Sequence, residues 1–287
     1  MSVAISLSDE TPRVASDADL ARADGEVGLR FVRDGKKTRL DGLSQRSPCR
    51  TILPNDGGPE PVGVLINTAG GVCGGDRLCA AVEVGKQASA TVTGQAAEKI
   101  YRAIDRPARL KTSLTVGDGA ALHWAPQETI LFDGAKLRRR TTVALAPNAR
   151  LLAAETLVFG RHAMGETLTA VDLCDEWRVS RNAALCWADL FRLRDTAPLQ
   201  APGGLAGRNA LATLIAAGPD LEQRRDAVRD RLERCDIEAG ATVVNGLLVV
   251  RLLGAARPVK NQLTNLLELL RQELLGLPPA LPRVWHC

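Results

Sequence analysis

The stretch that decides the fold is Val116-Gly-Asp-Gly-Ala120, which is followed by Glu128-Thr-Ile-Leu131. Two further copies of the pattern flank it: Val84-Gly-Lys-Gln-Ala88 with Glu98-Lys-Ile-Tyr101, and Leu145-Ala-Pro-Asn-Ala149 with Glu155-Thr-Leu-Val158. Each copy has an apolar residue, a turn, an alanine, a strand-like run, and a glutamate before apolar residues. The period is roughly 30 residues, which is typical of stacked repeats that bury their apolar faces against one another. We therefore expect stacked β-sheets, with three unrelated hairpins as the alternative.

The surrounding sequence extends this pattern from residue 27 onward. Apolar and polar residues alternate over 82–84, 88–93 and 110–116, and turn residues recur between these runs, which is typical of an all-β architecture. The last third differs, because residues 219–235 and 258–275 carry apolar residues at helical spacing. Between them, Val243–Leu253 is predicted to be one buried strand. The fold class is thus mainly β, with two C-terminal helices that cover the β body.

The domain organisation follows from composition along the chain. Residues 1–24 are rich in Ser, Asp, Ala and Thr and lack apolar periodicity, so we expect a disordered tail. No long polar linker interrupts the remainder, and residues 25–287 are predicted to form a single domain.

The overall composition excludes several classes of protein. The net charge of +4 is dispersed, with Arg138–Arg140 the only basic triplet, so nucleic-acid binding is not expected. No apolar run is long enough to span a membrane, and no signal peptide is evident, so we expect a cytoplasmic protein. In a reducing compartment the seven cysteines are expected to be free thiols.

A second informative stretch is the glycine-rich loop within Leu65–Leu78, with Gln95–Arg102 following it. Glycine pairs permit positive φ and close backbone approach, so this loop has a specific shape. It is not a phosphate-binding loop, because no Gly-Lys-Ser/Thr follows, nor a dinucleotide fingerprint, because a β-like run follows. The residues of interest are Gly70, Gly71, Gly74, Gly75, Asp76, Gln95, Glu98, Lys99 and Tyr101.

These two segments resemble the urease accessory protein UreD (UreH) family. The resemblance continues through Pro126–Asp133, Leu157–Glu166 and Leu281–Trp285, in the expected order, and covers roughly residues 27 to 285. Cys73 and Gly94 depart from it, since threonine is expected at both positions. The resemblance implies a mostly β, β-helix-like body. It also implies a non-enzymatic chaperone that docks on apo-urease with the accessory proteins UreF and UreG for nickel insertion, and GTP chemistry that belongs to UreG.

Nickel accepts imidazole, carboxylate and water ligands, and this chain has only three histidines. Nickel contacts should therefore rely on carboxylates and be transient, with no permanently bound cofactor. The candidates for a nickel path are Asp76, Glu98, Glu128, Asp133, Glu155 and Glu166. If the repeat is real, its three glutamates stack at sheet spacing and repel one another, so a cation such as Lys99, Arg102 or Arg161 should lie nearby. For Asp76, the alternative is a turn cap.

Two further hypotheses stay open at this point. An uncharacterised hydrolase or lyase could use Asp76 and Tyr101 in a β cleft, although a buried tyrosine is usually a core residue. The C-terminal region could bind a helical partner, which the resemblance implies to be UreF. The residues proposed for this contact are Leu263, Leu266, Leu270, Leu274 and Trp285, and a core-facing stripe is the alternative for the leucines.

Overall fold

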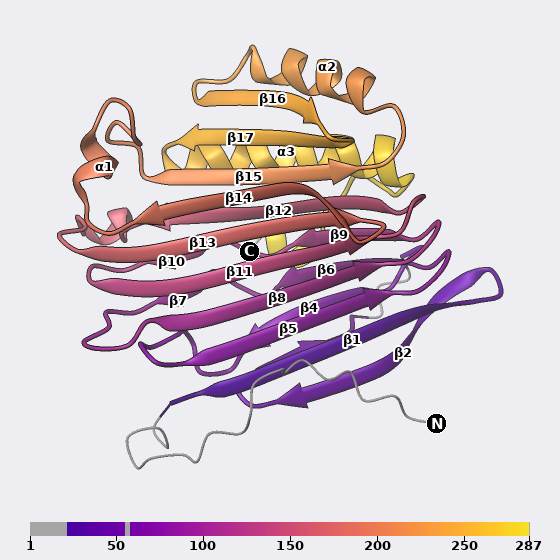
Figure 1. The fold of residues 1–287 in the computed structure, drawn as a ribbon, viewed down its shortest axis with the longest axis horizontal. Coiled ribbons are helices and arrows are strands. Elements are labelled where there is room, and N and C mark those ends of the chain that lie inside the picture. The colour runs from indigo at the N-terminus through magenta and orange to yellow at the C-terminus, as the bar shows by residue number, and fades with distance from the viewer. Residues whose placement is uncertain (1–21, 55–57, 287) are drawn as a thin grey trace.

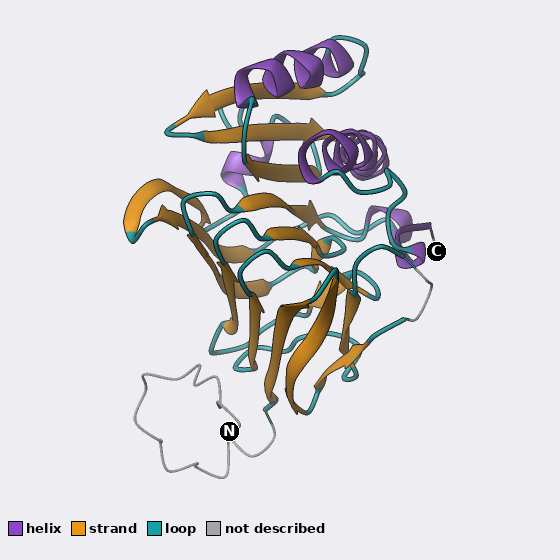
Figure 2. Ribbon diagram, turned by 90° about the vertical axis from the view of Figure 1, so that its right-hand side faces the viewer, coloured by secondary structure: helices purple, strands orange, loops and turns teal. Residues whose placement is uncertain are grey.

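The computed structural model describes residues 22–54 and 58–286. Within these residues the strands form two sheets that face each other (Figures 1 and 2). Sheet A has seven strands: β1 (Asp24–Asp34), β2 (Lys37–Arg46), β5 (Arg77–Val84), β8 (Ala108–Val116), β11 (Ala135–Leu145), β13 (Val171–Arg181) and β14 (Ala184–Leu193). Their order is β14-β13-β11-β8-β5-β1-β2.

Sheet B is larger and carries the helices. Its strands are β3 (Cys49–Ile52), β4 (Val62–Asn67), β6 (Ser89–Gly94), β7 (Glu98–Ile100), β9 (Ala121–Ala125), β10 (Thr129–Leu131), β12 (Arg150–Phe159), β15 (Ala210–Ala217), β16 (Glu238–Val244) and β17 (Leu247–Gly254). The main path is β16-β17-β15-β12-β9-β6-β4-β3, and β10 pairs with both β12 and β7. The chain alternates between the two sheets, so successive parallel strands stack into a solenoid-like body.

The first half of the predicted repeat is confirmed in register. Val84 lies opposite Val116, which lies opposite Leu145, across parallel strands of sheet A. Ala120 and Ala149 are both buried at the start of the return into sheet B. The expected fold class, a mainly β, stacked, β-helix-like body, is confirmed.

Two hydrophobic cores hold the molecule together. The larger lies between the sheets, and the second lies between sheet B and the helices. The helices are α1 (Ala197–Gln200), α2 (Leu221–Leu232) and α3 (Ala256–Leu275), with 3-10 turns at His162–Met164 and Arg283–His286. Helix α3 packs on β12, β15 and β17, and α2 packs on β16 and β17. Figure 2 shows α2 and α3 away from sheet A, so neither of these helices covers the outer face of sheet A.

Two local predictions need correction. The single strand expected over Val243–Leu253 is a hairpin, because Asn245 and Gly246 both adopt positive φ and turn the chain between β16 and β17. Asn-Gly is a strong signal for such a turn. The predicted tail over 1–24 lies largely outside the described residues, but Asp24 already begins β1.

Candidate functional site: a motif edge and a buried polar row

Four motif segments that are far apart in sequence meet at one edge of the stack, where β7 and β10 are drawn in Figure 1. Ile100, Leu131 and Phe159 occupy one column of parallel strands and are buried. Val72, from the glycine-rich loop, joins this column through a bridge to Ile100. We call the segments 70–76, 98–103, 129–134 and 159–170 the motif edge.

One or two positions after these buried residues, the motif edge carries a row of aromatic and cationic groups. The rings of Tyr101 and Phe132 meet edge to face with centroids 5.2 Å apart, and the Arg161 guanidinium lies 4.2 Å from the Phe132 ring centroid. The Tyr101 hydroxyl donates a hydrogen bond to the Gly70 carbonyl at 3.1 Å. A Cβ at Gly71 would lie 2.5 Å from the Tyr101 ring, which explains why glycine is needed there.

Two acidic residues of the edge, Asp133 and Glu166, are engaged in local bonds. Asp133 accepts hydrogen bonds from the Thr169 and Ala170 amides at 2.7 and 3.0 Å and pairs with Arg102 at 2.5 Å. Partial burial alone would raise the Asp133 pKa, but these amides outweigh it and lower the pKa to about 2. Glu166 pairs with Arg161 at 2.7 Å, and this hydrogen-bonded contact lowers its pKa.

Asp76 closes the glycine-rich loop and is buried, with an exposed fraction of 6%. Its carboxylate accepts hydrogen bonds from the amides of Ala23 at 2.8 Å and Cys73 at 2.7 Å. Both oxygens are therefore used to hold the loop against the start of β1. The geometry therefore favours the turn-cap interpretation of Asp76.

The predicted stack of three glutamates is wrong. Glu98 lies opposite Thr129, and Thr129 lies opposite Leu157, so Glu128 and Glu155 fall outside the column that contains Glu98. The spacers between alanine and glutamate differ in length among the three copies, and a slip of one residue turns a side chain to the other face of a sheet. Glu128 faces the helices, where it pairs with Lys260 of α3 at 3.2 Å.

Glu155 instead points between the sheets, into a buried ionic cluster. Arg139 of β11 donates two hydrogen bonds to Asp175 of β13, at 2.8 and 2.7 Å, and lies 3.2 Å from a Glu155 oxygen. The other Glu155 oxygen accepts a hydrogen bond from Thr141 at 3.0 Å. Burial raises the pKa of Glu155, and the raised pKa persists despite the nearby Arg139.

Other polar groups continue this cluster along the stacking direction. Arg139 also donates to Thr129 at 3.1 Å, and Thr129 is the strand neighbour of Glu98, whose pKa is raised by burial. Beyond Asp175, a space of about 10 Å³ separates the cluster from the ion pair of Asp189 and Arg251. The interior polar row, as we call it, comprises Asn67, Glu98, Thr129, Arg139, Glu155, Asp175, Asp189 and Arg251.

Most members of the interior polar row were not predicted from the sequence. A signal for them exists, because Arg139 and Asp175 occupy inward positions of strands whose other inward residues are buried and mainly apolar. A charged residue at such a position is costly unless it is paired. Of the six proposed carboxylates, the structure brings together only Glu98 and Glu155 in this row.

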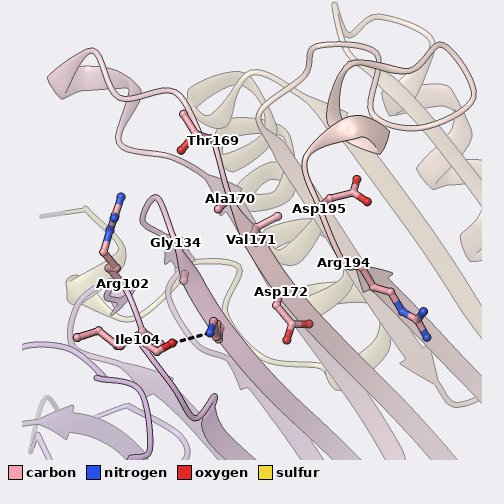
Figure 3. Close-up of a pocket in the computed structure, with 12 residues that line it drawn as sticks. Arg102, Ile104, Gly134, Thr169, Ala170, Val171, Asp172, Arg194 and Asp195 are labelled. Atoms are coloured by element: carbon pink, nitrogen blue, oxygen red, sulfur yellow. Dashed lines mark hydrogen bonds between the residues drawn. The ribbon is translucent and has the colours of Figure 1, made fainter.

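A groove of about 470 Å³ lies beside the motif edge. Lys136 donates a hydrogen bond to the Ile104 carbonyl at 2.8 Å across its floor (Figure 3). Arg102 and Arg194 lie on opposite sides of the groove and point apart in Figure 3.

The proposed partner-binding leucines need correction as well. Leu263, Leu266, Leu270 and Leu274 are each at most 2% exposed and pack in the core between sheet B and the helices. Trp285 is also buried, and its indole nitrogen donates to Thr93 at 3.0 Å. The core-facing alternative therefore holds for these leucines.

Among residues 22–54 and 58–286, no group of three or more His, Cys, Asp or Glu side chains is arranged to hold a metal ion. In the same part of the chain, no helix is long and apolar enough to cross a membrane.

Comparison with known proteins agrees with the motifs. The family model described as UreD urease accessory protein matches residues 23–286. A protein named urease accessory protein UreD from Methylobacterium sp. (strain 4-46) is 43% identical over 274 residues, which cover 92% of this chain and 95% of the relative. Proteins of the same name from Magnetococcus marinus and Azorhizobium caulinodans are 43% and 40% identical, over 91% and 92% of this chain and 93% and 96% of the relatives.

Proposed function

Since the chain belongs to the UreD urease accessory protein family, we propose that it is a cytoplasmic, non-enzymatic chaperone for assembly of the urease metallocentre. In this proposal it docks on apo-urease together with the accessory proteins UreF and UreG. It offers nickel(II) a protected route, with nickel as transient cargo and no resident cofactor. GTP hydrolysis belongs to a partner, since no Gly-Lys-Ser/Thr of a phosphate-binding loop follows the glycine-rich loop.

The observation that carries the proposal is the interior polar row. Replacing a buried ion pair by apolar residues is often neutral or stabilising, so stability alone is a weak reason to keep Arg139, Asp175 and Glu155 in the core. Carboxylates are acceptable nickel ligands, and side chains spaced along a row suit an ion that moves from one to the next.

The row is closed in this conformation. Its space of about 10 Å³ is at the lower limit for one water molecule, so a nickel ion could pass only if side chains moved. Arg139 bridges Asp175 and Glu155, and it is the group whose displacement would free both carboxylates. We infer that docking on urease favours this open arrangement.

The alternative function, a hydrolase or lyase that uses Asp76 and Tyr101, has weaker support. Both Asp76 oxygens accept backbone hydrogen bonds, and the Tyr101 hydroxyl is bonded to Gly70. Neither polar group is directed into the groove, whose lining contains neither residue.

The test is a pair of isosteric substitutions in the row, Glu98→Gln and Glu155→Gln, in cells that express urease and its accessory proteins. We expect the urease nickel content to fall several-fold in the double variant, while pull-down of the partners is unchanged. Glu128→Gln is the matched control, because Glu128 faces α3 and should leave nickel content unaltered. Full nickel content in the double variant would contradict the route, and GTP hydrolysis by the purified chain that a point change abolishes would contradict the chaperone.

A further inference from the structure

The outer face of sheet A carries a concentrated basic strip. Strand register places Arg77 opposite Arg109 and Arg109 opposite Arg138, in one row across β5, β8 and β11. In the next outward row, Lys111 of β8 lies opposite Arg140 of β11. We call these five residues the basic strip.

Like charges directly opposite one another destabilise a sheet, so this arrangement has a cost in the free chain. Acidic residues on neighbouring strands offset this repulsion only at the two sides of the strip. Arg77 pairs with Asp24 of β1 at 2.8 Å, and Arg138 and Arg140 pair with Asp172 and Glu176 of β13 at 2.6 and 2.7 Å.

The centre of the strip has no such relief. Arg109 and Lys111 are exposed on β8, and neither makes an ion pair or side-chain hydrogen bond with any residue the structure describes. The same outer face ends at β14, where Leu185 and Leu190 are 52% and 58% exposed. A cationic centre that shares a face with exposed leucines, here separated from it by β11 and β13, is typical of a surface that a partner covers.

The shape of the face supports the same conclusion. Strands β1, β5, β8, β11 and β13 are parallel to one another, and parallel sheets are normally covered on both faces. Here α2 and α3 pack on sheet B, and Figure 1 looks onto the outer face of sheet A, which neither helix covers. Seven strands about 4.8 Å apart and about ten residues long form a face of about 1,000 Å², which is enough for the ~800 Å² that one partner contributes to a standard interface.

We propose that the outer face of sheet A is a docking surface for an acidic protein surface of the urease maturation assembly, whose carboxylates neutralise Arg109 and Lys111. A protein is favoured over a nucleic acid, because Asp24, Asp172 and Glu176 flank the strip and would repel a phosphate backbone. This inference names a contact surface for the proposed function and rests on it.

The experiment is a charge reversal, Arg109→Glu with Lys111→Glu, in the full chain. Binding to purified apo-urease, UreF and UreG is measured separately and in combination at low and high salt. We expect at least a tenfold loss of affinity for one of these partners at low salt, and a smaller loss at high salt, because salt screens exposed charges.

The matched control is Arg234→Glu with Arg257→Glu, which changes the charge equally at exposed positions on the helix side. It should leave affinity unchanged, and Arg109→Gln with Lys111→Gln should show an intermediate loss. Circular dichroism and thermal melting check that each variant is folded.

If partner binding and urease activation are unchanged after the charge reversal, the docking surface is wrong. The proposed function would not be affected by that result. Failure of the unaltered chain to bind any of the three proteins would overturn both. If the charge reversal abolishes binding to duplex DNA or to anionic vesicles but leaves protein binding intact, the strip belongs to that other ligand and the proposal is wrong.

Discussion

Asp76 and Asp133 both lie at the motif edge, and both accept hydrogen bonds from backbone amides. Asp76 joins the glycine-rich loop to the residue before β1, while Asp133 joins the end of β10 to residues 169 and 170. An ionised carboxylate with several amide donors is held in place and loses its freedom to exchange ligands. At the residue scale, both carboxylates therefore act first as structural anchors.

Asp76→Ala should destabilise the protein, because it leaves the partly buried amides of Ala23 and Cys73 without acceptors. Each loss would cost about 1–3 kcal/mol for a fully buried group and costs less here, so the free energy of unfolding should fall by on the order of 2–4 kcal/mol. Urea denaturation of the purified variant measures this. An unchanged urea midpoint, together with a reduced nickel content of urease, would instead support Asp76 as a nickel ligand.

The stability of the protein should depend on pH through Asp133. Its pKa is lowered to about 2 in the folded chain, so its stabilising contribution is present above the unfolded value near 4 and is lost as the pH falls toward 2. The contribution should be of order 1–2 kcal/mol, after allowance for solvent screening of the exposed Arg102. The test is to measure the free energy of unfolding of the native chain and of Asp133→Asn from pH 5 to pH 2. If the two curves of free energy against pH are parallel, the prediction is wrong.

Helix α3 is attached to sheet B by polar bonds as well as by its leucines. Arg271 donates to Thr91 at 2.8 Å and to the His123 ring at 2.9 Å, and it forms an ion pair with Glu60. Burial, with a further contribution from Arg271, lowers the His123 pKa to about 3, so the ring is neutral and can accept this bond. At the scale of elements, α3 is an integral wall of the second core.

Leu270→Ala tests this role. The side chain is fully buried, so truncation should leave a cavity and reduce the free energy of unfolding by about 2–5 kcal/mol. Chemical denaturation gives the value, and Leu269→Ala, on a partly buried neighbour of the same helix, is the control with a smaller expected loss. Lost UreF binding at undiminished stability would show instead that the stripe contacts a partner.

The whole molecule consists of two cores that share sheet B. Neighbouring residues of β12 alternate between them, with Leu151 in the core between the sheets and Leu152 in the core beneath the helices. A strand that serves two cores couples them, because both cores lose packing if the strand detaches. The single domain predicted from the sequence should therefore unfold as one unit.

Tryptophan fluorescence can test this coupling. Trp124 and Trp177 report on the core between the sheets, and Trp285 reports on the helix-covered core. For the native chain, we expect the urea transition measured by fluorescence to coincide with the one measured by far-UV circular dichroism, and we expect the same for Trp285→Phe. Separate transitions for the two probes would show that the helices and the stacked sheets unfold independently.

Local patterns account for much of the architecture. Alternation predicted the strands, the period of roughly 30 residues predicted their stacking, and helical spacing predicted α2 and α3. The Asn245–Gly246 turn could also have been predicted, since both residues favour positive φ. The candidate site was predicted less well, because Arg139 and Asp175 meet only when separate strands are placed side by side.

The sequence by itself determined which residues are apolar, where the chain turns and how often the unit repeats, because these depend on neighbours along the chain. Only the tertiary structure decided which carboxylates share a face. The short strands β7 and β10 acquire their register from hydrogen bonds to neighbouring strands, and a one-residue slip directs Glu128 toward Lys260 while Glu98 and Glu155 point inward. Register is a long-range property, so the interior polar row is formed only in the folded chain.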